Sequence, residues 1–168
     1  MENHQSKTTY DKILEIVAVA ALLWAFYPLL FYNSIDSDAT FPTHYNFAGE
    51  VDGWGNRTSL WILPIIAILF YVGLSIVEML PRIMKYSRKM SEQDAGHLYR
   101  IGVQLIRHVK VLTILILAYG SNDIYAGAID KSFVHSPVII FLFIAALFLT
   151  VVIYTIKMLR CKPSSMKN

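Results

Sequence analysis

Long apolar runs constrain this chain more than any other feature of its sequence. The runs 13–32, 60–80 and 136–157 are each about twenty residues long and contain very few charged residues. A hydrocarbon core about 30 Å thick needs roughly twenty apolar residues at helical rise. A soluble protein has little use for three helices that are apolar around their whole circumference. These runs therefore predict three membrane-spanning helices.

A fourth apolar run is shorter and needs its flanks in order to cross a membrane. Its fully apolar part extends from Val111 to Tyr119 and follows an amphipathic stretch. To span, the helix must either let Arg107 and Lys110 extend toward the interface or continue outward to Ala128. We assign this span to about 106–127, after a stretch that lies along the interface. A re-entrant segment is the competing interpretation.

The distribution of Lys and Arg decides between three and four spans. Basic residues concentrate in 1–12, 81–107 and 157–168, whereas the loops 33–59 and 120–135 hold one each. Short basic loops stay on the cytoplasmic side of a membrane. Four spans place all three basic tracts on one side, and three spans would split them. Four spans are therefore expected, with both termini cytoplasmic.

The expected architecture is an all-α integral membrane protein of the cytoplasmic membrane. A single four-helix domain fills 1–160 and a short cytoplasmic tail fills 161–168. The formal charge of +3 is too small to indicate a nucleic-acid partner. The expected partner is the lipid bilayer, and the oligomeric state is left open.

The first outer loop, 33–59, is unlike an ordinary linker. Large aromatic residues alternate in it with polar groups, and three glycines and a proline shape its turns. This pattern predicts a compact outer cap that folds against the bundle. The residues expected to build the cap or to bind a ligand on it are Pro42, His44, Tyr45, Asn46, Gly49, Glu50, Asp52 and Trp54.

Three short motifs of this loop carry a family resemblance. Pro-Thr-His-Tyr-Asn, Ala-Gly-Glu and Asp-Gly-Trp-Gly stand between two apolar runs. They resemble the signature of a bacterial membrane domain of unknown function, which also forms the N-terminal half of immunity proteins against the sporulation-delaying-protein toxin. Val51 and Arg57 stand where that pattern tends to have Pro and Lys. The resemblance covers residues 13–80. It implies membership of the domain family, but it does not imply immunity to the toxin.

A divalent metal site is a second interpretation of the loop. His44, Glu50 and Asp52 offer an imidazole and two carboxylates, which suit zinc or a similar cation. Their spacing matches no standard metal motif, so turn hydrogen bonds within the cap are favoured and no cofactor is expected. The sequence also lacks a nucleophile motif, which argues against an enzyme.

Polar residues within or beside the spans have two interpretations. Asn122 and Asp123 form an intramembrane polar site if the third helix continues outward. If the helix ends at Tyr119, Gly120 is its C-cap and Asp123 lies in water, which is the favoured alternative. Glu15 and Glu78 are expected at the inner boundary, near Lys12 and Arg82, as interfacial charges.

The function that these features favour is non-enzymatic. We expect an immunity-like, sensing or accessory protein that recognises an extracytoplasmic peptide or protein through the outer loop. The alternative is a small transporter or channel-like protein, favoured if Asp123 faces a hydrated cavity. A metal-dependent membrane hydrolase is a further alternative, which requires a metal at His44, Glu50 and Asp52.

Overall fold

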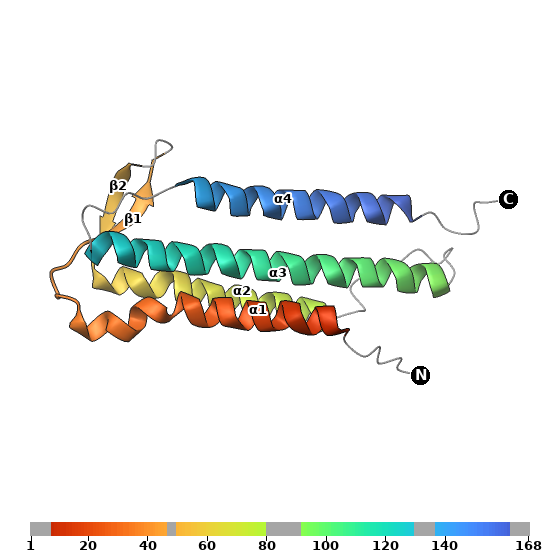
Figure 1. Cartoon of the computed structure of the whole chain (residues 1–168), viewed down its shortest axis with the longest axis horizontal. Coiled ribbons are helices and arrows are strands. Elements are labelled where there is room, and N and C mark those ends of the chain that lie inside the picture. Colours follow the sequence, from red (N-terminus) through yellow and green to blue (C-terminus); the bar gives the residue numbers. More distant parts are fainter. Residues whose placement is uncertain (1–7, 47–49, 80–91, 130–136, 162–168) are drawn as a thin grey trace.

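Four α-helices, two short 3-10 helices and one small hairpin make up the described part of the computed structural model (Figure 1). It describes residues 8–46, 50–79, 92–129 and 137–161. The elements are α1 (Thr9–Ala25), the 3-10 helix η1 (Tyr27–Ser34), β1 (Phe41–Tyr45), β2 (Val51–Gly55), the 3-10 helix η2 (Arg57–Trp61), α2 (Ile62–Met79), α3 (Glu92–Ile129) and α4 (Pro137–Arg160). All four α-helices belong to segments that are long and apolar enough to cross a membrane. The chain is therefore a multi-pass membrane protein in architecture.

Thr8 and Pro28 explain where the first helix begins and ends. Thr8 caps it, because its hydroxyl accepts a hydrogen bond from the Asp11 N–H at 3.2 Å. The Asp11 carboxylate in turn accepts from the Thr8 N–H at 2.9 Å, which completes a capping box. At the other end Pro28 has no N–H to donate, so α1 gives way to the 3-10 helix η1.

The third helix is the centre of the bundle. α3 contacts α1, α2 and α4, as well as β1, and it runs the length of the bundle in Figure 1. Its 38 residues correspond to about 57 Å at helical rise, more than the thickness of a hydrocarbon core. One continuous helix therefore connects the end of the bundle that carries the hairpin, the hairpin end, to the opposite end.

Small side chains let the first three helices approach one another closely. A buried cluster at their contact consists of Ala21, Ala25, Ala67, Ile114 and Ala118. Alanine at these positions brings helix backbones together, which is how helices associate in lipid. α4 packs mainly against α3 and keeps most of its apolar side chains exposed.

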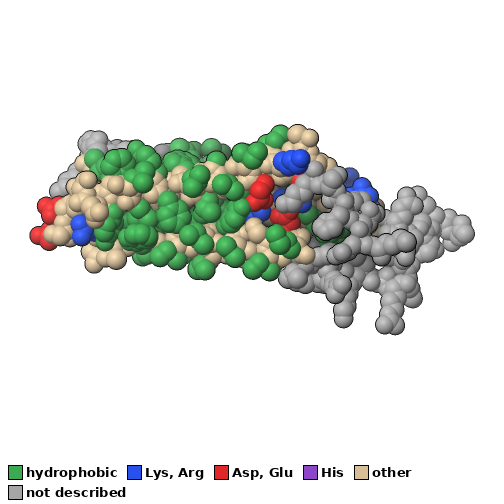
Figure 2. Space-filling model, turned by 90° about the horizontal axis from the view of Figure 1, so that it is seen from below, with side chains coloured by type: hydrophobic (Ala, Val, Ile, Leu, Met, Phe, Trp, Pro, Cys, Tyr) green, Lys and Arg blue, Asp and Glu red, His purple; other side chains and the backbone are tan. Residues whose placement is uncertain are grey.

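The outside of the bundle is apolar along its middle. Leu30, Leu69 and Phe148 are among many large apolar side chains left exposed. Figure 2 shows hydrophobic side chains along the middle of one face, with acidic and basic side chains toward its two ends. A surface of this kind is suited to lipid as the surrounding solvent.

Two expectations need correction. The chain is mostly helical but not all-α, because residues of the loop pair into a two-stranded antiparallel sheet. The third helix does not end at Tyr119 with Gly120 as its cap, since α3 continues to Ile129. Ser121 and Asn122 are accommodated within it because their side chains bond to carbonyls of α1.

Candidate functional site

The hairpin formed by β1 and β2 depends on two close contacts at glycines. Phe41 pairs with Gly55, and His44 pairs with Gly53. A Cβ atom added at Gly53 would lie 2.9 Å from the Cβ of His44. A Cβ added at Gly55 would lie 2.2 Å from the hydroxyl of Ser59. Neither position has room for a side chain, so these glycines are needed for packing.

Buried residues of β1 anchor the hairpin to the bundle. Phe41 and Pro42 are fully buried, and β1 lies against α3. Arg57 secures the base of the hairpin, because its guanidinium donates to the carbonyl of Ile35 at 3.1 Å. The same guanidinium lies over the ring of Tyr32, 4.6 Å from its centroid. The predicted cap is thus a hairpin fastened at its base.

One side of the hairpin presents three chemically different groups outward. Asp52 and Trp54 are two residues apart on β2 and therefore project to the same side. His44 reaches across from β1 and contacts the Asp52 carboxylate through its Nδ1. Side-chain exposure is 72% for His44 and 46% for Asp52, and Trp54 is 62% exposed. We call these three residues the hairpin face.

The other predicted cap residues bond among themselves or lie outside the described residues. Asn46 donates to the Glu50 carboxylate at 2.9 Å, and its side-chain oxygen accepts from the Glu50 N–H at 3.0 Å. Gly49 lies outside the described residues, as does the side chain of Tyr45. Of the three metal candidates, His44 contacts Asp52 whereas Glu50 bonds to Asn46. Among the described residues, no group of three or more His, Cys, Asp or Glu side chains could hold a metal ion.

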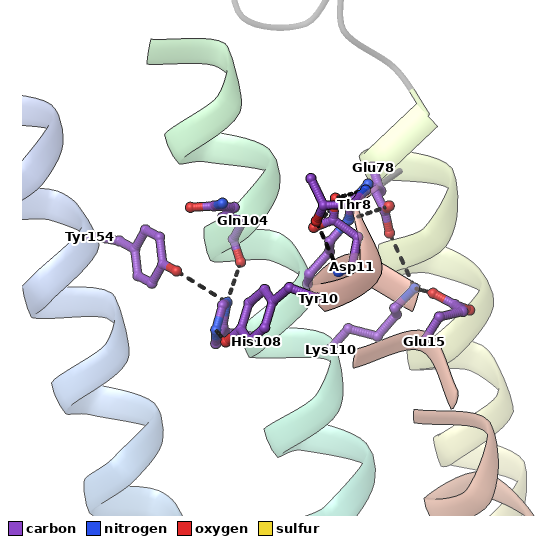
Figure 3. A network of polar contacts seen from close by, with 10 residues as sticks. Thr8, Tyr10, Asp11, Glu15, Glu78, Gln104, His108, Lys110 and Tyr154 are labelled. Carbon is purple, nitrogen blue, oxygen red and sulfur yellow. Dashed lines mark hydrogen bonds and ion pairs between the residues drawn. The ribbon is translucent and has the colours of Figure 1, made fainter. Parts of the chain in front are cut away.

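A buried cluster of charged side chains lies at the opposite end of the bundle (Figure 3). At its centre the Lys110 ammonium, with its side chain 2% exposed, contacts three acceptors. It lies 2.8 Å from Glu15 Oε2, 3.2 Å from Glu78 Oε2 and 3.2 Å from the hydroxyl of Ser75. The three N–H donors of the ammonium therefore each have an acceptor. Through these contacts Lys110 of α3 connects α1 to α2.

Arg107 makes a second connection between the same three helices. Its Nε donates to Glu78 Oε1 at 2.6 Å, and its NH1 pairs with Asp11 Oδ1. That Asp11 oxygen is buried without a hydrogen bond of regular geometry, so the guanidinium ion pair is what compensates its charge. Glu15 also accepts from the hydroxyl of Tyr71 at 2.5 Å. We call Asp11, Glu15, Glu78, Arg107 and Lys110 the ion cluster, and the end that holds it the cluster end.

The ion cluster gives its acidic members partners that the sequence did not predict. Glu15 pairs with Lys110, and Glu78 pairs with both Arg107 and Lys110. Arg82 lies outside the described residues. Arg107 and Lys110 do not extend toward the interface, because they are held inside the bundle. The sequence contains a pattern that could have predicted this pairing. Glu15 and Glu78 interrupt two apolar spans, and basic residues interrupt a third span at a comparable depth.

Beside the ion cluster, His108 connects α3 to α1 and α4. Its Nδ1 lies 2.6 Å from the backbone oxygen of Gln104, which can only accept, so Nδ1 carries the hydrogen. The hydroxyl of Tyr10 lies 2.7 Å from Nε2, and that of Tyr154 lies 3.3 Å from Nδ1. His108 thus lies between the hydroxyl groups of Tyr10 on α1 and Tyr154 on α4.

Asn122 has a structural task at the hairpin end. In a continuous helix the Trp24 carbonyl would accept from residue 28, but Pro28 has no N–H. The Asn122 side chain donates to this carbonyl at 2.9 Å and to that of Ala118 at 2.8 Å. The neighbouring Ser121 hydroxyl donates to the Ala25 carbonyl at 2.9 Å. Asp123 is 9% exposed, so it is buried within the bundle.

Comparison with known proteins identifies the segment that contains the hairpin. A family model described as Domain of unknown function (DUF1648) matches residues 16–68. An uncharacterised protein of Archaeoglobus fulgidus is 47% identical over 51 residues, which is 30% of this chain and 26% of that protein. The chain thus spans about a quarter of the length of this relative. No solved structure matches the chain significantly.

The two candidate sites differ in their relation to this match. Every residue of the hairpin face lies within 16–68, whereas every member of the ion cluster lies outside it. The match therefore covers the hairpin together with most of α1 and the first part of α2, and it does not extend to the residues of the ion cluster.

Proposed function

We propose that this protein is a non-enzymatic protein of the cytoplasmic membrane that recognises a peptide or protein ligand through its hairpin face. The observation that carries the proposal is the contrast between Phe41, fully buried, and Trp54, 62% exposed on the same hairpin. An indole held outward on an anchored hairpin gives binding area with little loss of conformational entropy. Tryptophan is also among the residues enriched at binding hot spots.

The distribution of basic residues supports an outward-facing hairpin. The tracts 1–12, 81–107 and 157–168 hold two, six and four Lys or Arg residues, and the hairpin loop 33–59 holds Arg57 alone. Basic loops are retained on the cytoplasmic side, so both termini are cytoplasmic in this proposal. The hairpin face would then meet ligands that approach from outside the cell.

The charge of the loop indicates what kind of ligand fits. Residues 33–59 hold four acidic residues, Asp36, Asp38, Glu50 and Asp52, against the single basic Arg57, so their formal charge is −3. A partner with complementary charge is steered toward such a surface. Together with the exposed indole of Trp54, this favours a cationic, amphipathic peptide. The role is then immunity-like or sensory.

Binding to the protein in lipid nanodiscs tests this proposal. The probes are a panel of fluorescent cationic amphipathic peptides, measured against nanodiscs without protein. Trp54→Ala and Asp52→Asn should each weaken binding by about tenfold, the size of a moderate hot spot. Asp38→Asn is the matched control, because Asp38 is exposed but lies outside the hairpin face. Equal binding by all three variants, or no binding above empty nanodiscs, contradicts the proposal.

A small transporter or channel-like protein is a second candidate, which the ion cluster favours. Ionisable residues inside a membrane span commonly line ion or substrate pathways. The cluster joins α1, α2 and α3 through Arg107 and Lys110. Proton or potassium flux from liposomes that contain the protein tests this candidate, and flux equal to that of protein-free liposomes counts against it.

A further inference from the structure

The last turns of α4 hold an exposed ammonium group in a defined place. Lys157 is exposed, and its Nζ lies 4.8 Å from the centroid of the Tyr154 ring. Tyr154 is itself buried, and its hydroxyl lies 3.3 Å from Nδ1 of His108 on α3 (Figure 3). A cation over the face of a tyrosine ring is attracted by the π-electrons of that ring. The ammonium is therefore positioned by a side chain that packs against the neighbouring helix.

The length of α4 places this ammonium at the boundary of the hydrocarbon core. The sequence from Pro137 to Ile156 contains no Asp, Glu, Lys or Arg, so Lys157 is the first charged residue of the helix. It follows Pro137 by 20 residues, which is about 30 Å at helical rise. A hydrocarbon core is also about 30 Å thick. With Pro137 at one edge of the core, the Lys157 ammonium lies level with the lipid phosphates at the cluster end.

Arg160 adds a second exposed cation on the same side of the helix. It follows Lys157 by three residues, a spacing that makes two helical side chains neighbours. Ile153 and Ile156 precede these two cations by four residues each, and both isoleucines are exposed. Each cation therefore has an exposed apolar side chain next to it, one turn deeper in the membrane. We call Lys157 and Arg160 the basic pair.

An anionic phospholipid fits this order of groups. Its phosphate is negative and lies at the boundary of the hydrocarbon core, and its acyl chains extend from there into the core. An ammonium attracts a phosphate as a point charge, and a guanidinium can donate two parallel hydrogen bonds to it. A soluble anion would contact the two cations but would gain nothing from the two isoleucines.

We propose that the basic pair binds the phosphate of an anionic phospholipid, and that an acyl chain of the same lipid packs on Ile153 and Ile156. The site faces the lipid at the cluster end, so it is independent of the hairpin face and of the orientation of the chain in the membrane. Basic residues at this end of α4 also favour one orientation and complement the helix dipole. Those two roles require charge alone, whereas a lipid site requires these two cations and the ring that positions one of them.

Native mass spectrometry of the whole protein tests the site with two lipid probes, phosphatidylglycerol and phosphatidylcholine. In titrations from detergent micelles, the wild type should bind the first molecule of anionic phosphatidylglycerol more tightly than that of zwitterionic phosphatidylcholine. Lys157→Gln and Arg160→Gln should each weaken binding of phosphatidylglycerol about fivefold, the contribution of one basic residue near an anionic surface. Neither variant should change binding of phosphatidylcholine. Lys12→Gln is the matched control and should bind both lipids like the wild type, because Lys12 is an exposed lysine at the same end of the bundle but on α1.

The ring of Tyr154 provides a second test, which charge alone would not affect. Tyr154→Leu should weaken binding of phosphatidylglycerol about threefold, because the ammonium of Lys157 loses the ring that positions it. Tyr154→Phe keeps the ring and should bind like the wild type, although the contact of the hydroxyl with His108 is lost. Unchanged binding in Tyr154→Leu would contradict a positioned ammonium.

Three further results overturn the proposal. Equal affinity of the wild type for the two lipids shows that no anionic lipid is selected. A loss in Lys12→Gln as large as in Lys157→Gln shows that only the overall charge attracts the lipid. Displacement of phosphatidylglycerol by an equal concentration of inorganic phosphate shows that the basic pair binds a free anion and not a lipid. Circular dichroism checks that the variants are folded, and Arg160→Gln decides if Lys157→Gln does not fold.

Discussion

The ammonium of Lys110 on α3 lies 2.8 Å from the carboxylate of Glu15 on α1, a residue 95 positions earlier in the chain. The same ammonium lies 3.2 Å from the carboxylate of Glu78 on α2. Because both contacts are made at one depth, they fix how the three helices are aligned along the bundle axis. Buried ion pairs often specify a geometry in this way, even where they add little net stability.

Replacing Lys110 with methionine should destabilise the bundle by about 3 kcal/mol, because it removes the cation that the buried Glu78 and the partly exposed Glu15 carboxylates share. The measurement is the unfolding midpoint in mixed detergent micelles, followed by circular dichroism. Lys12→Met is the matched control, since Lys12 is an exposed lysine on α1. Its effect should stay below about 0.5 kcal/mol. Equal midpoints for the two variants would show that Lys110 is not an essential partner.

Much of the architecture follows from the sequence because lipid imposes a simple rule. A span in hydrocarbon must satisfy its own backbone and expose apolar side chains, so the length and composition of the apolar runs indicate three of the helices directly. The distribution of Lys and Arg adds the fourth. The break of α1 before Pro28 also has a local cause. The hairpin was harder to predict, because its short strands contain Pro42, Gly53 and Gly55, which are uncommon in strands.

The candidate sites show where sequence reasoning ends. The loop residues around His44 and Trp54 stand out by composition, but their orientation depends on the strand register and on the burial of Phe41. The ion cluster depends on which helix faces meet. Lys110 and Glu15 become partners only when α1 and α3 are aligned side by side. The residues next to each of them in the sequence do not predict this alignment. For this reason the sequence predicted charges near the inner boundary but not their pairing with Arg107 and Lys110.

Replacing each of two glycines with alanine should change stability in opposite directions. Gly55→Ala should destabilise the hairpin, because the new Cβ would lie 2.2 Å from the hydroxyl of Ser59 and 2.7 Å from Cγ2 of Thr43. Gly73→Ala should stabilise α2 by up to about 1 kcal/mol, since a Cβ there meets nothing within 4 Å. Limited proteolysis of the loop and the unfolding midpoint report the two effects. A Gly55→Ala variant as resistant to protease as the wild type would contradict the close packing.

The proposed orientation predicts a labelling pattern in intact cells. In a Cys161→Ser background, Asp38→Cys at the hairpin end should react with a membrane-impermeant maleimide added from outside. Arg160→Cys, at the end of α4, should react only after the membrane is permeabilised. Both positions are exposed, so accessibility differs through the membrane alone. The reverse pattern would place the hairpin inside and remove the proposal of an external ligand.

The break in α1 gives a prediction that couples two helices. Asn122→Ala should cost about 1 kcal/mol, because the Trp24 carbonyl loses the donor that replaces the missing N–H of Pro28. Pro28→Ala supplies an N–H at that position, so in its background the cost of Asn122→Ala should become smaller. Unfolding midpoints of the two single variants and the double variant give the coupling energy. Additive effects would show that Asn122 does not compensate for the proline.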